Sequence, residues 1–303
     1  MKEVKGAVFV IISAVIFGCM PMAAKFLYAE GCNSVSLVFY RYSLTLPVLF
    51  VMALWEQKGE RKEGQKADIR KLMKITTFQM QQFVVLSAGF AVTPILLFAS
   101  YNYISSGSAT TIHFSYPVFV ILASVFIFKE KATFTKAAAV LFCVAGLVLF
   151  YEPGQSGGVM GIVLALTSGI TYTFYMMFFD RSELKFIKPF KTNFYLSLIS
   201  AGLVLVFALI TKTFVILPSA KAWFMAFGFS FMLTVVACVL CQVGIVLVGA
   251  QKTAVLSTFE PITSVVMGVI CFHETVGIKT GLGVLFILAA VLSVTLFDKK
   301  KTQ

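Results

Sequence analysis

Charged residues are scarce in this sequence, and most of the chain is apolar. Aspartate, glutamate, lysine and arginine together make up 13% of the 303 residues, whereas 59% are hydrophobic, and the mean hydropathy is +0.93. A soluble domain of this size has too little interior to bury so much apolar surface. The scarcity of charge therefore excludes an ordinary soluble protein and predicts an all-α membrane protein with little room for a separate soluble domain.

The groups that bind metals and nucleotides are also few. The chain has two histidines and six cysteines, and the close pair Cys238 and Cys241 has no second pair or nearby histidine that would complete a zinc or redox motif. Residues 59–66 only partly match a phosphate-binding loop, because they lack the Gly-Lys-Ser/Thr ending and a strand–helix context. We therefore expect no metal site and no cofactor, and an energy source other than nucleotide hydrolysis.

Hydrophobic runs that could cross a bilayer recur about ten times. A bilayer core of roughly 30 Å requires about 20 apolar residues in a helix. The first run also resembles a secretory signal, but its removal would leave the first half a helix short, so we interpret it as a retained helix. The runs predict ten transmembrane helices, at residues 5–24, 34–54, 83–103, 107–128, 135–150, 159–179, 193–211, 222–248, 254–272 and 280–297.

The lysines and arginines are distributed unevenly between the two predicted faces. Twenty lie in the termini and loops of one face and four in the loops of the other, while Arg41 lies inside a span. Because cytoplasmic loops carry an excess of basic residues, both termini are predicted to face the cytoplasm, in the cell (inner) membrane. The net charge of +12 therefore reflects membrane orientation, and no nucleic-acid partner is expected.

The two halves of the chain share a pattern at an offset of 144 residues. Pro117 followed by Glu130 matches Pro261 followed by Glu274, and the helices after them also align. This order predicts two copies of one five-helix unit, at residues 1–151 and 158–298. Five is an odd number, so the second copy enters the membrane from the opposite side. Such inverted repeats are frequent in secondary transporters, with the substrate site near the midplane between the copies.

These motifs resemble the EamA-type branch of the drug/metabolite transporter superfamily over nearly the whole chain. The matching residues are, in chain order, Phe17-Gly18 with Lys25, Arg41, Tyr116-Pro117 with Glu130, and Glu260-Pro261 with Glu274. The resemblance implies a metabolite transporter, commonly an exporter, with its substrate left open. Lys129 and His273 replace the glycine that the family usually has before the two exit acids, so we expect the tight glycine turn to be lost.

Glu260 and Arg41 are the most informative charged residues, because a charge at mid-bilayer costs roughly 2.5–3.5 kcal/mol and usually faces a wet cavity or a partner. Ser257, Glu260 and Ser264 share one helical face. Glu260 is a candidate substrate or proton site, with a hydrogen bond to a neighbouring helix as the structural alternative. Arg41 could bind a substrate carboxylate or pair with Glu260, and its alternative is to reach the interface with its long stem.

Polar and aromatic residues of other spans complete the predicted substrate site. His113 and Tyr116 lie on one face of the fourth span, and the repeat aligns them with Ser257 and Glu260, although a lone histidine is more often a packing residue. Most phenylalanines must face lipid or packing partners, so each aromatic candidate competes with that role. The further candidates are Ser13, Phe17, Tyr101, Asn102, Ser168, Tyr172 and Tyr175.

Prolines inside spans and acids at span exits are the candidates for gating. Pro94, Pro117 and Pro261 each free a backbone carbonyl within a span, which membranes tolerate where protein or cavity water satisfies it. Glu130 and Glu274 follow their prolines by thirteen residues, or roughly 20 Å of helix. They therefore reach the interface, where gate latches or helix caps are more natural roles than substrate ligands.

A secondary transporter of small molecules is the leading interpretation, with the lipid bilayer and a small-molecule substrate as partners. Protons are a possible coupling ion, and the protein could be a monomer or a homodimer. A polytopic membrane enzyme is the second hypothesis, but Ser106 and Ser108 do not form a dyad with His113 between helices, so we expect no enzyme activity. A lipid-translocating or scaffold protein of the same fold is the third.

Overall fold

The computed structural model describes residues 2–58, 73–127, 129, 133–150, 158–248, 253 and 256–297. Within these residues the chain forms helices joined by turns and contains no strand. In the first half the helices are α1 (Lys2–Gly18), α2 (Met20–Ala29), α3 (Ser34–Ser43), α4 (Leu46–Lys58), α6 (Thr77–Ser100), α7 (Ser106–His113), α8 (Tyr116–Phe126) and α9 (Phe134–Leu149). In the second half they are α10 (Gly158–Arg181), η1 (Glu183–Phe186), α11 (Pro189–Ile210), α12 (Ala220–Ser230), the π-helix η2 (Phe231–Ala237), α13 (Cys238–Val248), α15 (Phe259–Phe272) and α16 (Ile278–Phe297).

Six helical stretches of the described chain are long and apolar enough to cross a membrane. Their bounds are Glu3–Ala29, Ser34–Glu56, Thr77–Ser100, Gly158–Phe179, Pro189–Ile210 and Ala220–Cys241. Shorter apolar helices cover Lys136–Leu149, Phe259–Phe272 and Ile278–Ser293. The expectation of a polytopic all-α membrane protein is therefore confirmed.

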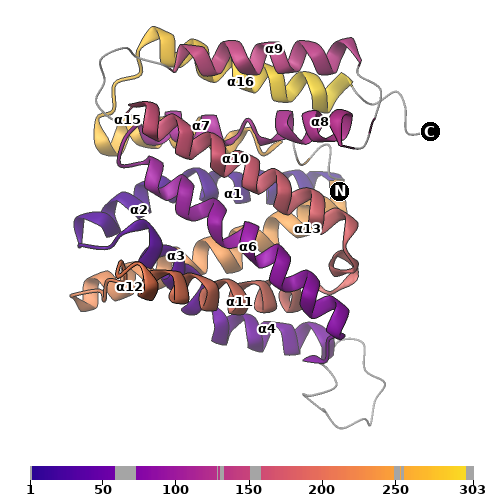
Figure 1. The fold of residues 1–303 in the computed structure, drawn as a ribbon, viewed down its shortest axis with the longest axis vertical. Helices are drawn as coiled ribbons and strands as arrows, with labels where there is room; N and C mark the ends of the chain where they lie inside the picture. The colour runs from indigo at the N-terminus through magenta and orange to yellow at the C-terminus, as the bar shows by residue number, and fades with distance from the viewer. Residues whose placement is uncertain are drawn as a thin grey trace.

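The helices run side by side and form a stack of tiers (Figure 1). The pair α9 and α16 forms one end of the stack, and α4, α11 and α12 form the other, with α1, α6, α10 and α13 between them. The first turn of α1 and the last turn of α16 lie at the same, right-hand edge of this view. The chain thus enters and leaves the helical stack on one side.

Local signals explain where several helices begin. The Asn33 side chain accepts a hydrogen bond from the Ser36 amide and starts α3, and Thr76 forms a capping box with Gln79 at the start of α6. Long-range packing then depends on glycine. In α1 a Cβ on Gly6 would meet Leu247 and Val248 of α13, and in α9 a Cβ on Gly146 would meet Ile287 of α16. Small residues allow these helix backbones to approach closely, as is usual in membrane bundles.

Candidate functional site

Four spans are broken near their middle, and each break is followed by a proline. The second half-helices α2, α4, α8 and α15 have a proline in their first turn, at Pro21, Pro47, Pro117 and Pro261. Proline is tolerated there because the first-turn amides have no intrahelical acceptor. The sequence interpretation identified Pro117 and Pro261 as breaks but missed Pro21 and Pro47, whose signal is also a proline inside an apolar run.

Pro94 is different, because α6 continues through it. A proline has no amide hydrogen, so the Phe90 carbonyl four residues earlier has no intrahelical donor. The Tyr42 hydroxyl donates to that carbonyl at 2.7 Å, and the Tyr42 and Phe90 rings stack at 5.0 Å. The freed carbonyl is thus satisfied by α3.

Glu260 stands in the first turn of α15, where the helix N-terminus favours a negative charge. Its side chain keeps accessible surface although it lies deep inside the helix stack, within electrostatic range of Arg41, Tyr101, Tyr116, Tyr172 and Cys241. We call these six residues the polar centre. They come from α3, α8, α10, α13, α15 and the turn after α6, so residues far apart in the sequence converge there.

Arg41 and Glu260 face the same region without forming an ion pair, since no Arg41 nitrogen lies within 4.0 Å of a Glu260 oxygen. Arg41 is 7% exposed, and its guanidinium lies 5.6 Å from the centre of the Tyr42 ring. Its Nε and the Tyr101 hydroxyl are buried and form no hydrogen bond of good geometry with any described residue, although Thr110 lies near the Tyr101 hydroxyl. The polar centre therefore holds two opposite charges and two unused hydrogen-bonding groups, a combination suited to a small polar ligand.

His113 and Ser168 meet across the seam between α7 and α10. The Ser168 hydroxyl donates to the Ala165 carbonyl at 2.7 Å, so its oxygen must accept the 2.8 Å hydrogen bond from His113 Nδ1. This assigns the Nδ1–H tautomer to His113 and leaves Nε2 as an acceptor. The His113 ring lies 5.4 Å from Tyr172 and 6.1 Å from Tyr116, at the edge of the polar centre.

Aromatic rings form a continuous wall beside the polar centre. Tyr116 and Tyr172 meet edge to face at 4.7 Å, Tyr172 stacks on Tyr175 at 5.7 Å, and Tyr175 reaches Phe90 at 5.2 Å. Tyr175 also lies within electrostatic range of Arg41. Such a wall suits a flat or amphipathic ligand.

The remaining predicted site residues have other surroundings. Ser13 is buried and donates to the Ala237 carbonyl at 2.8 Å, next to the π-helix η2. Phe17 packs against the main apolar cluster. Ser257 lies in the turn before α15, where its carbonyl accepts the Glu260 amide at 2.9 Å. Asn102 is exposed in the turn after α6, and the structure does not bring it into the polar centre.

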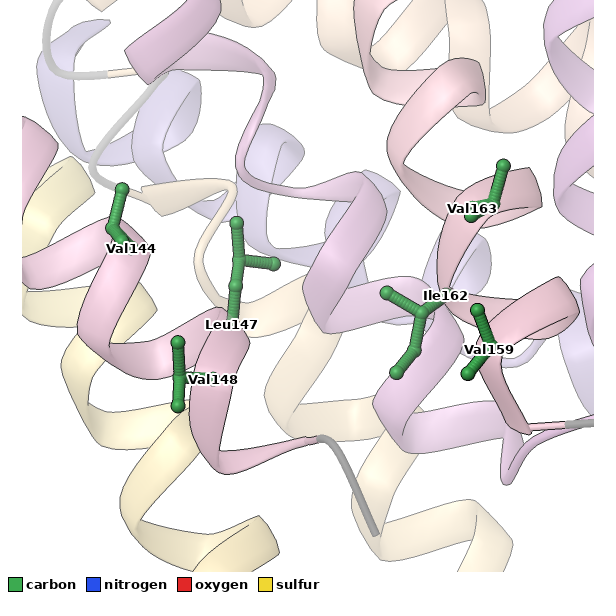
Figure 2. Close-up of a pocket in the computed structure, with 6 residues that line it drawn as sticks. All are labelled: Val144, Leu147, Val148, Val159, Ile162 and Val163. Carbon is green, nitrogen blue, oxygen red and sulfur yellow. The ribbon is translucent and has the colours of Figure 1, made fainter. Parts of the chain in front are cut away.

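The groove shown in Figure 2 is not the polar site. It has a volume of about 290 Å³ and lies between α9 and α10. Its lining consists only of Val144, Leu147, Val148, Val159, Ile162 and Val163. Without a polar group it can orient no solute by hydrogen bonds, and in a membrane protein its natural contact is lipid.

Glu274 ties three spans together at one edge of the stack. Its carboxylate pairs with Lys25 of α2 and accepts hydrogen bonds from the Ser106 amide at 3.2 Å and hydroxyl at 3.0 Å, at the start of α7. Gly268 leaves the room that the carboxylate occupies. Glu274 thus combines an ion pair with a helix cap. Its counterpart Glu130 lies outside the described residues.

The expectation that the tight glycine turns are lost is wrong. Lys129 and His273 both adopt the left-handed conformation that glycine favours, with φ of 55° and 51°. For a residue with a side chain this conformation costs about 1–2 kcal/mol. At the second turn the conformation is held by tertiary contacts, because the Glu274 amide bonds back to the Gly268 carbonyl while its carboxylate holds Lys25 and Ser106.

Gly18 provides a sensitive test of the packing at the polar centre. A Cβ at this position would lie 2.6 Å from the Glu260 carbonyl oxygen and 2.5 Å from Thr263. We expect Gly18→Ala to separate α1 from α15, to destabilise the protein by about 1–3 kcal/mol and to impair transport. Thermal unfolding and vesicle transport would measure both effects. Gly202→Ala is the control, since a Cβ there meets nothing within 4 Å; equal effects of the two variants would contradict this account.

A second ion pair at the same edge as Glu274 gives a weak pH signature. The hydrogen bond from Lys221, with its charge, lowers the pKa of Glu30 below the usual value. Because the pKa of this carboxyl is lower in the folded than in the unfolded protein, the ion pair stabilises the fold at pH values above the unfolded-state pKa of about 4.3. This stabilisation is lost as the pH falls through the folded-state pKa. We expect the unfolding temperature below about pH 4 to fall slightly more steeply in the parent than in Lys221→Met. Parallel melting curves for the two proteins would refute the coupling.

Broken helices that bring opposite charges together inside an all-α membrane bundle are typical of membrane transport proteins. The family model described as "EamA-like transporter family" matches residues 4–151 and 159–296. The chain belongs to the EamA-like transporter family, and it is a multi-pass protein of the cell inner membrane.

Relatives named as transporters agree with this assignment. The uncharacterized transporter YcbK of Bacillus subtilis is 23% identical over 92% of this chain and 88% of its own length. An uncharacterized transporter of Archaeoglobus fulgidus is 28% identical over 67% of this chain and 74% of its own length. The uncharacterized inner membrane transporter YhbE of Escherichia coli is 26% identical over 48% of this chain and 43% of its own length. One solved crystal structure is similar in fold, with TM-score 0.66 and 13% identity, over 96% of this chain and 97% of that one.

Proposed function

We propose that the chain crosses the membrane ten times as two inverted five-helix repeats, residues 1–151 and 158–298, with both termini in the cytoplasm. Contacts between the halves support this, because they occur in matched pairs. The contact of α1 with α13 corresponds to that of α10 with α6, and the contact of α1 with α15 corresponds to that of α10 with α8. Helices that the repeat equates, α9 with α16 and α3 with α11, touch each other directly.

The positions of breaks and glycines give independent support. The break at Phe114 and Ser115 corresponds, at the offset of 144, to the turn at Thr258 before α15. Gly6 lies against Leu247 and Val248, and its counterpart Gly161 lies against Tyr103 and Ile104, which are separated from the first pair by the same 144 residues. Termini at one edge of the stack also agree with an even number of crossings (Figure 1).

We further propose a secondary transporter, acting as an exporter, for small metabolites such as amino acids or related amphipathic solutes. It works by alternating access through a central cavity between the repeats. One observation carries the proposal: buried Arg41 and partly accessible Glu260 are opposite charges inside the helix stack that form no ion pair with each other and that stand beside a wall of tyrosines. Buried charges are costly unless they serve a ligand or a hydrated path.

An efflux screen tests this function. Cells that overproduce the chain are loaded with single amino acids or their dipeptides, and release is compared with cells producing Glu260→Gln at equal membrane levels. Everted vesicles with and without a proton gradient then separate coupled from facilitated transport. Efflux that is the same with and without the chain, for the whole panel, would remove amino acids and their relatives as substrates.

A membrane enzyme is the alternative favoured by one contact, the 2.8 Å approach of Ser168 to His113. A serine nucleophile must donate its proton to the histidine base. The Ser168 proton is directed instead to the Ala165 carbonyl, and Ser168 is fully buried. The pair therefore holds α7 against α10, and we propose that the chain carries out no covalent catalysis. Hydrolysis of acyl esters by the purified protein, lost in Ser168→Ala, would reverse this.

A further inference from the structure

A second group of buried polar side chains lies away from the polar centre, on α6 and α11. Within the described part of the chain, the hydroxyls of Ser87 and Ser197 and the amide nitrogen of Asn193 form no hydrogen bond. These residues are 0%, 0% and 4% exposed. Buried polar groups in native proteins nearly always have a protein or water partner, so three unused ones on two adjacent helices indicate an occupant.

The two serines differ from other buried hydroxyls of the described helices, which donate either within their own helix or, as Ser13 and Ser264 do, to a neighbouring helix. A buried serine or threonine in a helix usually donates to a carbonyl three or four residues earlier. That bond is formed by Thr45, Ser100, Thr111, Ser115, Ser168, Thr173 and Ser230. Ser87 and Ser197 do not form it, so their hydroxyls are available to a ligand.

The register of the helices places the three side chains in a row of about 10 Å along the contact between α6 and α11. The rings of Phe83 and Tyr195 lie 5.4 Å apart, and the Ser200 hydroxyl donates to the Ser87 carbonyl at 3.3 Å, so α6 and α11 run parallel. Ser197 lies one turn before Ser200, and Asn193 one turn before Ser197, on one face of α11. We call Ser87, Asn193 and Ser197 the α11 seam.

The seam lies on a line from Arg41 to one edge of the stack. Helix α3–α4 runs antiparallel to α11, as fixed by the bond from Asn33 to the Thr213 carbonyl and the 5.4 Å approach of Phe50 to Phe194. This register sets Arg41 about two helical turns beyond Ser197 along α11. In the opposite direction, Lys191 and the amino end of α11 lie within one turn of Asn193.

The chemistry of the seam selects an anionic group. Its unused groups include an amide donor and two hydroxyls that can donate. Helices α3, α6, α11 and α13 contain no acidic residue, and the Glu56 carboxylate of α4 is held by the Phe190 amide at 3.1 Å. The amino end of α11 and the Lys191 side chain add positive potential. A cation is therefore disfavoured, and a carboxylate that accepts several hydrogen bonds fits.

We propose that the α11 seam is a second binding site, which takes the carboxylate of a solute on its way between Arg41 and the face that carries Lys188 and Lys191. The proposal rests on the transport function proposed above and adds that the substrate bears a carboxylate. A solute that passes from the seam to Arg41 keeps its negative charge matched to hydrogen-bond donors at both positions.

Substituted cysteines test the site without knowledge of the substrate. We expect Ser197→Cys to react with the anionic 2-sulfonatoethyl methanethiosulfonate at least tenfold faster than with its cationic trimethylammonium counterpart. Acetate and benzoate should slow this reaction, whereas acetamide and benzamide should not. Intact mass counts the groups added above the parent, whose six cysteines set the baseline. The matched control is Leu196→Cys, at an equally buried neighbour that packs in an apolar cluster, and it should stay unreactive.

Three results would overturn the proposal. They are equal reaction rates for Ser197→Cys and Leu196→Cys, faster reaction of Ser197→Cys with the cationic reagent, or no slowing of its reaction by acetate or benzoate. The last would mean that the seam holds water only. Stability gives a second measurement, since Ser87→Ala and Ser197→Ala remove unpaired groups and should melt no lower than the parent. A melting temperature below that of the parent in both variants would show that the two hydroxyls are structural. Acetate protection with no efflux of any amino acid would leave the seam intact and reject only the proposed substrates.

Discussion

Glu260→Gln is expected to abolish transport while the protein remains folded in the membrane. The substitution keeps the shape and removes the charge that opposes Arg41 across the polar centre. Removing one member of a buried charged constellation costs about 2–5 kcal/mol of binding, which corresponds to a loss of roughly 30-fold or more. Initial efflux rates at matched protein levels would measure the loss.

The experiment separates a ligand role from a structural one. Glu260 accepts no hydrogen bond within the described chain, so its neutral amide leaves no broken contact and the melting temperature should change little. Arg41→Gln should give a similar loss of transport. Glu183→Gln, at an exposed acid, is the control for general effects of charge. Full transport by Glu260→Gln would remove this residue from the mechanism.

Much of the architecture could be predicted from apolar run length, because a bilayer requires long hydrophobic helices whatever their partners. The predicted helix boundaries are less accurate. The third span was predicted from residue 83, whereas α6 begins at Thr77. Its first turns contain Gln79, Gln81 and Gln82, polar residues that a hydrophobicity criterion rejects but that a capped helix end at the interface accepts. The Thr76–Gln79 capping box was the signal for the true start.

The candidate site could also be predicted in part from the apolar character of the chain. A buried charge such as Glu260 or Arg41 stands out against an apolar background, so both could be identified from the sequence alone. The residues that pair with each other across long sequence separations could not be identified in this way. Lys25 and Glu274 are 249 positions apart, and Ser168 is 55 positions from His113. Their pairing depends on how the halves pack, and no local pattern encodes it. The π-helix η2 contains neither proline nor glycine that would mark it in the sequence.

Glu274→Gln is expected to loosen the edge of the stack where α2, α7 and α15 meet. Glutamine keeps an acceptor for Ser106 but loses the Lys25 ion pair, whose side chains are only 23% and 14% exposed, and it weakens the charged cap. Hydrogen bonds to charged groups contribute about 1.5–3 kcal/mol, so an open conformation should become roughly 10- to 100-fold more populated. Native Cys271, whose sulfur lies 3.4 Å from that of Met22, reports this directly, because maleimide labelling should accelerate by a similar factor.

Two further variants show that the cap and the ion pair act together. Glu30→Gln breaks the other ion pair of this edge, but Lys221 there is 72% exposed, so labelling of Cys271 should change less than threefold. The exchange of Lys25→Glu with Glu274→Lys restores opposite charges yet sets an ammonium against the Ser106 amide. We expect fast labelling to persist in this double variant, because a lysine cannot accept the hydrogen bonds that start α7. A return to the parental rate would mean that charge pairing alone closes this edge and that the Ser106 cap is dispensable.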